Sequence, residues 1–188
     1  ITNSRSTVGT LTNINEHLKT LWTNLAAPHC PLCGSTLTAW SPEATVAKLA
    51  ELCSAKPKSA FLIACRYPLL TGKNAARATS ERLLLLGYNR AFNPESGRAD
   101  LLEDLPAPPL CEGSYILPVL DRFSAASFSK KRLIDSIKQS LALNGKACVV
   151  IELAESASKQ IQAQPSFHEF STELKCPNDG STLPSPTP

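Results

Sequence analysis

The sequence predicts an α+β fold, in which a mixed or antiparallel sheet with several helices is joined to a zinc-knuckle stem. Segments of helical periodicity and short apolar segments typical of strands follow one another without strict alternation, which argues against a doubly wound sheet. Proline and glycine clusters separate these segments. A Cys-x-x-Cys pair lies near the start of the chain, and a related Cys-Pro pattern lies near its end.

The size and composition exclude several classes of protein. The 188 residues suffice for one domain with a substantial core, with or without an appendage. No apolar run approaches a membrane span, and the N-terminus lacks the apolar region of a signal peptide, so we expect a cytoplasmic protein without membrane contact. The chain does not begin with Met, which is compatible with a piece of a longer protein. Its net charge of +3 permits contact with nucleic acid without arguing for it.

Four helices are predicted from apolar spacing and capping residues. The first covers 12–26, with Thr12 as its N-cap. The second covers 41–53, where Ser41 is a good N-cap and Pro42 suits the first helical position. Two further helices are predicted over 72–87, which Gly87 would end, and over 129–144.

Strands are predicted where short apolar or aromatic runs lie between turn residues. The segment 114–123, "SYILPVLDRF", contains Pro118 and should therefore be an edge strand or carry a bulge. The remaining predicted strands are 60–67, a hairpin of 88–92 with 98–102, the core strand 147–153, and a short strand near 167–170.

The segment "PHCPLCGSTL" contains half of a zinc site, because Cys30 and Cys33 supply two of the four ligands that tetrahedral zinc needs. The similar segment "LKCPNDGSTLP" supplies Cys176, but it has Asp179 where a second cysteine is expected. A metal ion shared by both segments would hold close together the points where the chain enters and leaves the residues between them. Three thiolates with one carboxylate are an uncommon structural set, and the alternative is that Cys30 and Cys33 are bystander thiols. The odd total of seven cysteines favours free thiols and a metal over a disulfide framework.

Catalytic chemistry finds little support in the sequence. Neither His17 nor His168 has an obvious nucleophile or acid partner, and we interpret both as surface histidines. The Gly-Lys pair at 72–73 lacks the glycine pattern of a phosphate loop. A small zinc hydrolase with an open coordination position stays an alternative, although no general base is visible. The basic run 129–132 is interpreted as the first turn of an exposed helix, and the alternative is direct DNA contact through Lys130, Lys131 and Arg132.

Five segments, taken in order, resemble the UvrA family of bacterial nucleotide excision repair proteins. They are "SRSTVGTLTNINEHLKTLW", "PHCPLCG", "LLLGYNRAF", "LPVLDRF" and "ELKCPNDGSTLP". The resemblance covers nearly all of the chain, and its first two segments are the most specific. In that family the region begins in the signature domain of the first ATPase half, passes through a zinc knuckle, forms the UvrB-binding domain, and returns through a second knuckle to the same zinc.

The resemblance implies a domain division and a cofactor. Residues 1–35 would be the stem helix and first knuckle, 36–172 the UvrB-binding domain, and 173–188 the second knuckle and tail. Zinc would be held by Cys30, Cys33, Cys176 and Asp179, the last standing where the family has cysteine. This fragment would not be an enzyme, because the ATP-binding motifs lie elsewhere in the family. The intact protein would be an ABC-type ATPase of the UvrABC excinuclease, a homodimer that contacts damaged DNA and is part of the SOS response.

The resemblance also implies residues that bind UvrB. One is Arg90 in "GYNR", and the other is Arg122 in "VLDR", preceded by Asp121. Arginines form bidentate contacts with carboxylates and are frequent among the residues that dominate interfaces. Without the resemblance, each arginine would be interpreted as part of a surface ion pair. The arginine-rich loop that the family often has is largely absent from 67–77.

Overall fold

The computed structural model describes residues 8–72, 74–104, 115–144, 146–153 and 165–183. The chain divides into two compact units, one formed by 1–39 with 173–188 and the other by 40–172. The predicted α+β class is confirmed, because helices accompany sheets whose strands all pair in antiparallel fashion. Among the described residues, no helix combines the length and apolar character that crossing a membrane requires.

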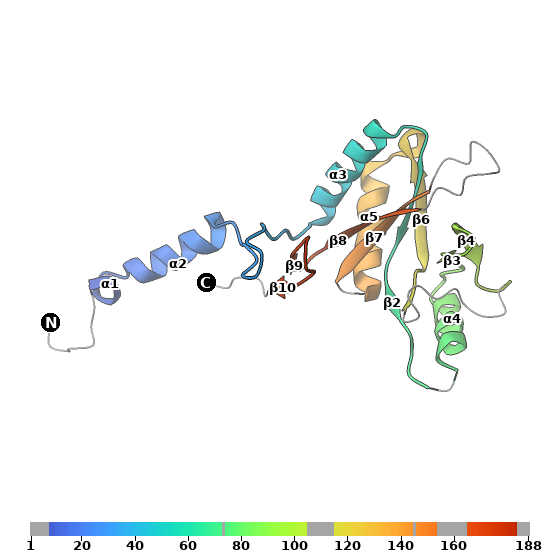
Figure 1. Cartoon of the computed structure of the whole chain (residues 1–188), viewed down its shortest axis with the longest axis horizontal. Helices are drawn as coiled ribbons and strands as arrows, with labels where there is room; N and C mark the ends of the chain where they lie inside the picture. Colours follow the sequence, from blue (N-terminus) through green and yellow to red (C-terminus); the bar gives the residue numbers. More distant parts are fainter. Residues whose placement is uncertain (1–7, 73, 105–114, 145, 154–164, 184–188) are drawn as a thin grey trace. The chain divides into compact units, whose positions relative to one another are not determined.

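A four-stranded antiparallel sheet is the framework of the unit 40–172, with strand order β6-β1-β7-β8 (Figure 1). The strands are β1 (Ala60–Ala64), β6 (Val119–Ser124), β7 (Ala147–Leu153) and β8 (Ser166–Ser171). The two inner strands, β1 and β7, are almost wholly buried. Their continuous apolar sequences follow from this position, because other elements cover both of their faces.

Two helices, α3 (Pro42–Ala55) and α5 (Lys130–Asn144), cover one face of this sheet (Figure 1). Leu49 of α3 and Leu133 of α5 pack with Phe61 and Phe123, whose rings stack 5.3 Å apart. The start of α3 is as predicted, because the Ser41 hydroxyl accepts a hydrogen bond from the Ala44 amide at 3.1 Å.

The opposite face of the sheet packs against a hairpin of β3 (Arg90–Asn93) and β4 (Arg98–Leu101). Phe92 of β3 is buried with Leu62 of β1 and Ile151 of β7, and we call this group the Phe92 cluster. The predicted hairpin is thereby confirmed. Helix α4 (Ala75–Leu85) packs through Leu83 in a further cluster, and it ends before Gly87, whose φ of 88° only glycine adopts readily.

The strand predicted over 114–123 is two strands. β5 (Tyr115–Ile116) pairs with β2 (Tyr67–Pro68), and β6 begins after Pro118. The register between β6 and β1 shifts near the start of β6, and β6 lies at the sheet edge, so the prediction made from Pro118 is confirmed. A short 3₁₀ helix, η1 (Ala125–Ser127), connects β6 to α5.

The other unit contains helices α1 (Val8–Leu11) and α2 (Ile14–Leu25) and the paired strands β9 (Leu174–Lys175) and β10 (Thr182–Leu183). Thr12 is not the N-cap that the sequence predicted. Its hydroxyl instead donates to the Val8 carbonyl at 2.7 Å, and α2 begins after Asn13, whose φ is 56°. The structure describes the whole of α2, and no residue of this helix is buried.

Candidate functional site

Four potential metal ligands from the two ends of the chain converge in the unit that contains both termini. The ligand atoms of Cys30, Cys33, Cys176 and Asp179 all lie within 4.8 Å of one another. The Sγ atoms of Cys33 and Cys176 are 3.4 Å apart, and Cys30 Sγ lies 3.2 Å from Asp179 Oδ2. Zinc–sulfur bonds of about 2.3 Å in a tetrahedron place two sulfurs roughly 3.8 Å apart. The four donors therefore fit a tetrahedral metal ion.

The two knuckles repeat one local structure. Residues 30–37 read "CPLCGSTL" and residues 176–183 read "CPNDGSTL". Gly34 and Gly180 occupy the same place in each knuckle, with φ of 73° and 71°. The same backbone hydrogen bonds recur, from Cys30 to Ser35 at 2.8 Å and from Gly34 to Cys30 at 2.9 Å, and from Cys176 to Ser181 at 2.8 Å and from Gly180 to Cys176 at 3.1 Å.

This repetition places Asp179 at the position that Cys33 occupies in the first knuckle. Sequence reasoning recognised only the cysteine, proline and glycine of the second knuckle, although the repeat continues through the Ser-Thr-Leu that follows. The structural equivalence makes the carboxylate the counterpart of the missing thiolate. It also explains which ligands lie in contact. The fourth residue of each knuckle lies against the first residue of the other, Cys33 against Cys176 and Asp179 against Cys30.

The Asp179 carboxylate is held in a defined orientation. Its Oδ1 accepts a hydrogen bond from the Ser181 amide at 2.7 Å, while Oδ2 lies against Cys30. Hydrogen bonds from the Ser181 side chain and backbone, with a smaller one from Cys30, hold the pKa of the Asp179 carboxyl well below its usual range. The group is thus ionised at neutral pH and presents one oxygen to the cluster as a ligand.

The thiols differ in their readiness to ionise. Hydrogen bonds from the side chain and backbone of Ser35 lower the pKa of the exposed Cys33 thiol to about 7. At Cys176 the change is in the other direction. A hydrogen bond from the Asp179 backbone lowers the pKa of this thiol, but burial and the neighbouring thiols outweigh it and raise the pKa to about 11. The side-chain amide of Asn178 also donates, through Nδ2, to Cys33 Sγ at 3.7 Å and to Ser35 Oγ at 2.8 Å. Near neutral pH the Asp179 carboxylate is therefore ionised and the Cys33 thiol, with its lowered pKa, is partly ionised.

The donor set favours a closed structural metal site. Thiolates favour zinc over hard cations such as magnesium and calcium, and four protein donors fill a tetrahedron. Cys30 and Cys176 are buried with Leu37, so the base of the site is apolar. Within the described part of the chain, the cluster holds no histidine and no second carboxylate that could act as a general base. The geometry therefore gives the zinc hydrolase alternative no support.

The two predicted partner-binding arginines lie in the other unit. Arg90 is exposed at the start of β3, shares a strand face with Phe92, and donates to the Ala99 carbonyl at 3.2 Å. Arg122 is exposed on β6 and lies opposite Leu62 of β1. Since Phe92 and Leu62 belong to one cluster, both arginines stand on the side of the sheet that the hairpin covers.

Asp121, which the resemblance grouped with these arginines, has a partner within the unit. Its carboxylate accepts from Arg132 of α5, at 2.9 Å between Arg132 Nε and Asp121 Oδ2, and from the Ser136 hydroxyl at 3.1 Å. The hydrogen bond and charge of Asp121 raise the pKa of Arg132 further above its usual value. Arg132, one of three residues in the DNA-contact alternative, is thus engaged inside the unit.

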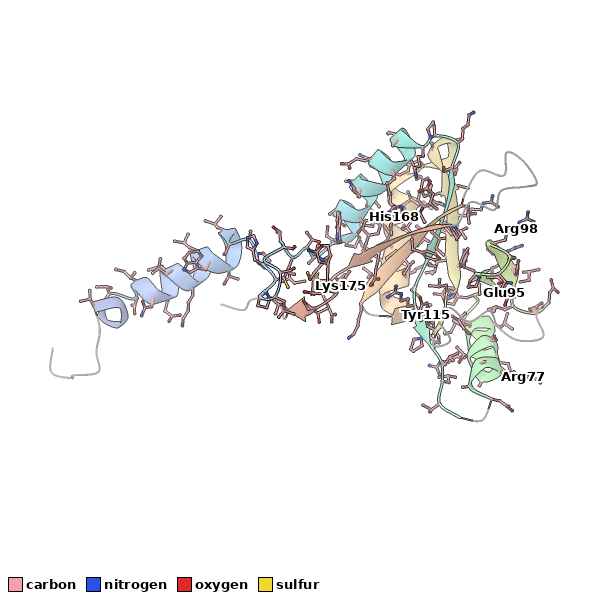
Figure 2. All side chains as sticks on the ribbon, in the orientation of Figure 1. Arg77, Glu95, Arg98, Tyr115, His168 and Lys175 are labelled. Carbon is pink, nitrogen blue, oxygen red and sulfur yellow. The ribbon has the colours of Figure 1, made fainter. Side chains whose placement is uncertain are left out.

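The interpretation of His168 as a surface histidine without an acid partner is wrong. His168, which Figure 2 labels, lies on β8. Its Nε2 lies 3.7 Å from Oε2 of Glu152, a buried residue that also accepts from Lys56 Nζ at 2.8 and 2.9 Å. His168 pairs with Val150, so the register of β8 on β7 brings it near Glu152. The Ser59 hydroxyl also donates to Glu152 Oε1, at 3.4 Å, so it lies against the carboxylate, and we assign the group to the stability of the sheet.

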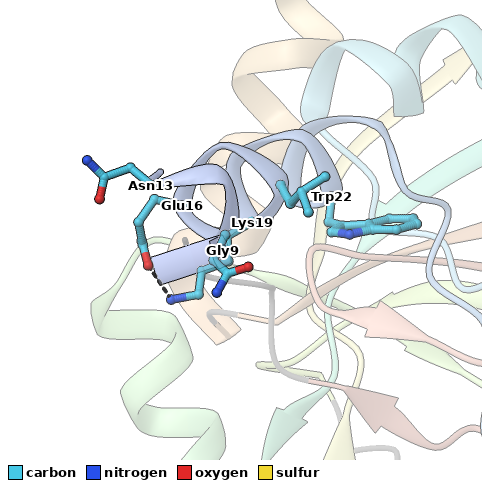
Figure 3. A pocket seen from close by; sticks show the side chains of 7 residues that line it. Gly9, Asn13, Glu16, Lys19 and Trp22 are labelled. Atoms are coloured by element: carbon cyan, nitrogen blue, oxygen red, sulfur yellow. Dashed lines mark hydrogen bonds and ion pairs between the residues drawn. The ribbon is translucent and has the colours of Figure 1, made fainter. Parts of the chain in front are cut away.

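A separate hollow of about 490 Å³ lies between the first two helices (Figure 3). Lys19 and Glu16, at its margin, form an exposed ion pair of 2.9 Å. Its other lining residues are Gly9, Asn13, Asn15, Leu18 and Trp22. A hollow lined by these exposed residues offers no cluster of reactive or metal-binding groups.

Comparison with known proteins finds similar curated proteins but no matching family model. A scan against protein-family models found no match. UvrABC system protein A from Aquifex aeolicus is 29% identical over 185 residues, covering 97% of this chain and 18% of that protein. The Streptomyces avermitilis protein of the same name is 32% identical over 177 residues, covering 94% of this chain and 17% of that protein. The chain therefore spans less than a fifth of the length of the curated relatives that it matches.

Proposed function

We propose, on the premise that this chain is homologous to one segment of UvrABC system protein A, that it is the UvrB-binding module of a UvrA-like protein in nucleotide excision repair. The observation that carries this proposal is the similarity to UvrABC system protein A, which extends over 94–97% of the chain. In this role the module binds a protein and has no catalytic activity of its own. The wider protein would be an ABC-type ATPase that acts in the cytoplasm as a homodimer on damaged DNA.

The metal cluster supports this proposal, because it ties together the places where the chain enters and leaves the intervening residues. Cys30 and Cys33 precede the unit 40–172, and Cys176 and Asp179 follow it. A module inserted into a longer protein needs such a junction. Zinc at this site would fix the junction, since a structural metal contributes its binding free energy to the folded state.

The two arginines give the proposed partner surface its chemistry. Arg90 and Arg122 are exposed, and neither guanidinium has a carboxylate partner among the hydrogen bonds and ion pairs of the described residues. Guanidinium groups in this state can form bidentate contacts with carboxylates of a partner. We therefore assign binding of acidic side chains of UvrB to this side of the sheet, and the module would help to load UvrB at lesions.

A pull-down experiment with UvrB tests the proposal. The 188-residue chain, immobilised through a tag, should retain purified UvrB, whereas an Arg90→Ala/Arg122→Ala double variant should retain much less. A parallel sample with a zinc chelator shows whether the knuckles matter for binding. Retention of double-stranded DNA in place of UvrB, with the steep salt dependence of phosphate contacts, would instead favour DNA contact through Lys130 and Lys131.

A further inference from the structure

The edge strand β6 is tied to helix α5 by a side-chain arrangement that the proposed function does not use. Arg132 of α5 donates through Nε to Asp121 Oδ2 at 2.9 Å, and through Nη2 to Asp121 Oδ1. The same Nη2 donates to the Arg122 carbonyl at 2.7 Å. The Ser136 hydroxyl, one turn further along α5, also donates to Asp121 Oδ2 at 3.1 Å. One guanidinium thus holds two consecutive residues of the strand.

These contacts satisfy both backbone groups of Arg122. Its amide donates to the Asp121 carboxylate at 2.7 Å, and its carbonyl accepts from Arg132. Strand β6 is at the edge of the sheet, where unpaired backbone groups invite pairing with another strand. At Arg122 the side chains of Asp121 and Arg132 form the backbone hydrogen bonds that an added strand would otherwise form.

Asp121 and Arg122 point to opposite faces of the sheet. Asp121 lies opposite Ile63, on the face that α3 and α5 cover, whereas Arg122 lies opposite Leu62, on the face that carries the Phe92 cluster. The carboxylate is largely buried, with 14% of its side chain exposed, so it has little freedom to turn. Because successive residues of a strand alternate in direction, fixing Asp121 on one face directs Arg122 to the other.

We propose that Arg132 and Asp121 are a positioning pair, which holds Arg122 toward a carboxylate of the partner and closes the edge of β6 to strand addition. The identity of the partner rests on the proposed function, whereas the closure of the strand edge does not. Arg132 acts through Arg122 and does not itself touch the partner.

Three single variants of the 188-residue chain test this pair. Arg132→Lys keeps the positive charge but removes the planar fork that reaches both carboxylate oxygens and the carbonyl. Asp121→Asn keeps the shape of the side chain and removes its charge. Lys131→Ala is the matched control, because Lys131 is an exposed neighbour of Arg132 on the same helix. Far-UV circular dichroism and thermal melting confirm that each variant is folded.

Two readouts separate positioning from a merely structural role. Amide hydrogen exchange at Arg122, followed by NMR, should become roughly tenfold faster in Asp121→Asn, since a charge-assisted hydrogen bond is lost. The Kd for UvrB should weaken by roughly tenfold in Arg132→Lys, whereas Lys131→Ala should leave both readouts unchanged. In the double variant Arg132→Lys/Arg122→Ala, the Kd should match that of Arg122→Ala alone, because Arg132 acts through Arg122.

Each alternative outcome is informative. Independent, multiplicative losses from Arg132→Lys and Arg122→Ala would overturn the positioning role. Unchanged exchange at Arg122 in both Asp121→Asn and Arg132→Lys would overturn the closed edge. If Arg122→Ala leaves UvrB binding intact, the proposed function fails at this residue and the positioning role fails with it, while the exchange measurement still decides whether the pair closes the edge.

Discussion

Cys33 and Cys176 lie 143 positions apart in the sequence, and their Sγ atoms are 3.4 Å apart in the structure. This contact, with the matching one between Cys30 and Asp179, makes two knuckles into one four-donor cluster. Each knuckle alone supplies only half of a tetrahedral site. The folded unit formed by the two ends of the chain therefore brings together four donors that could hold one metal ion.

The identity of residue 179 should set the affinity for zinc. Replacing a carboxylate by a thiolate suits this borderline metal better, so Asp179→Cys should raise zinc affinity by on the order of tenfold or more. With zinc in excess, a tenfold gain in affinity stabilises the folded form by about 1.4 kcal/mol. Competition with a chromophoric chelator measures the affinity, and Asp179→Asn is the control, which should bind more weakly than the wild type. Equal affinity in all three proteins would remove residue 179 from the ligand set.

Removal of the metal should loosen the unit that holds the knuckles and spare the other unit. The sheet of residues 40–172 has its own buried clusters, centred on Phe61 and on Phe92, and these do not involve the ligands. After chelation we expect faster amide exchange at the knuckle residues and unchanged exchange in β1 and β7. Loss of protection throughout β1 and β7 would show that the metal also supports the sheet, contrary to this expectation.

The sequence predicted elements whose causes are local and missed relationships that depend on register. The start of α3 was predictable because Ser41 and Pro42 act on their own helix. The start of α2 was missed by two residues, because the Thr12 hydroxyl is bound to the Val8 carbonyl of α1 and the helix begins after Asn13 instead. The pairing of Asp121 with Arg132 depends on how β6 packs on α5, and nothing in the sequence spacing indicates it.

The cluster of four possible ligands was predictable in its residues but not in its symmetry. Spacing identified Cys30, Cys33 and Cys176, and the position of Asp179 in the second knuckle suggested a fourth donor. That the two knuckles share backbone hydrogen bonds and glycine conformations required the structure. The proximity of His168 to Glu152 likewise depends on the pairing of β8 with β7.

Acid should weaken the sheet unit through Glu152. Burial by itself would raise the pKa of Glu152, but the hydrogen bond and charge of Lys56, helped by His168 and Ser59, outweigh it and lower the pKa. The folded-state pKa therefore lies below the unfolded value of about 4.3. The stabilisation is present above the unfolded value and is lost as the pH falls through the folded value.

Urea unfolding at pH 7 and pH 3 measures this contribution. The free energy of unfolding should fall less between the two pH values in Glu152→Gln than in the wild type. Glu51→Gln is the control, because Glu51 pairs with Lys48 at the surface, where an ion pair contributes little. The same loss on acidification in the wild type and in Glu152→Gln would assign the pH dependence to other groups.

The isolated chain should not hydrolyse ATP. Its two Gly-Lys pairs, at 72–73 and 145–146, both lack the glycine-rich pattern that cradles phosphates. A coupled assay for released phosphate should give the rate of a control protein without a nucleotide site. Turnover that rises with the concentration of this chain and survives further purification would contradict the assignment of a pure binding module.

The most direct test of the central claim is a calorimetric titration of UvrB into the 188-residue chain, compared with the Arg90→Ala and Arg122→Ala variants. An arginine that dominates an interface contributes about 2 kcal/mol or more, so each variant should weaken the Kd by about thirtyfold while melting like the wild type. Lys131→Ala, at an exposed site on α5, should bind like the wild type. Saturable binding that both arginine variants weaken is the predicted result. No binding by the wild-type chain, or the same Kd for all variants, would contradict the account.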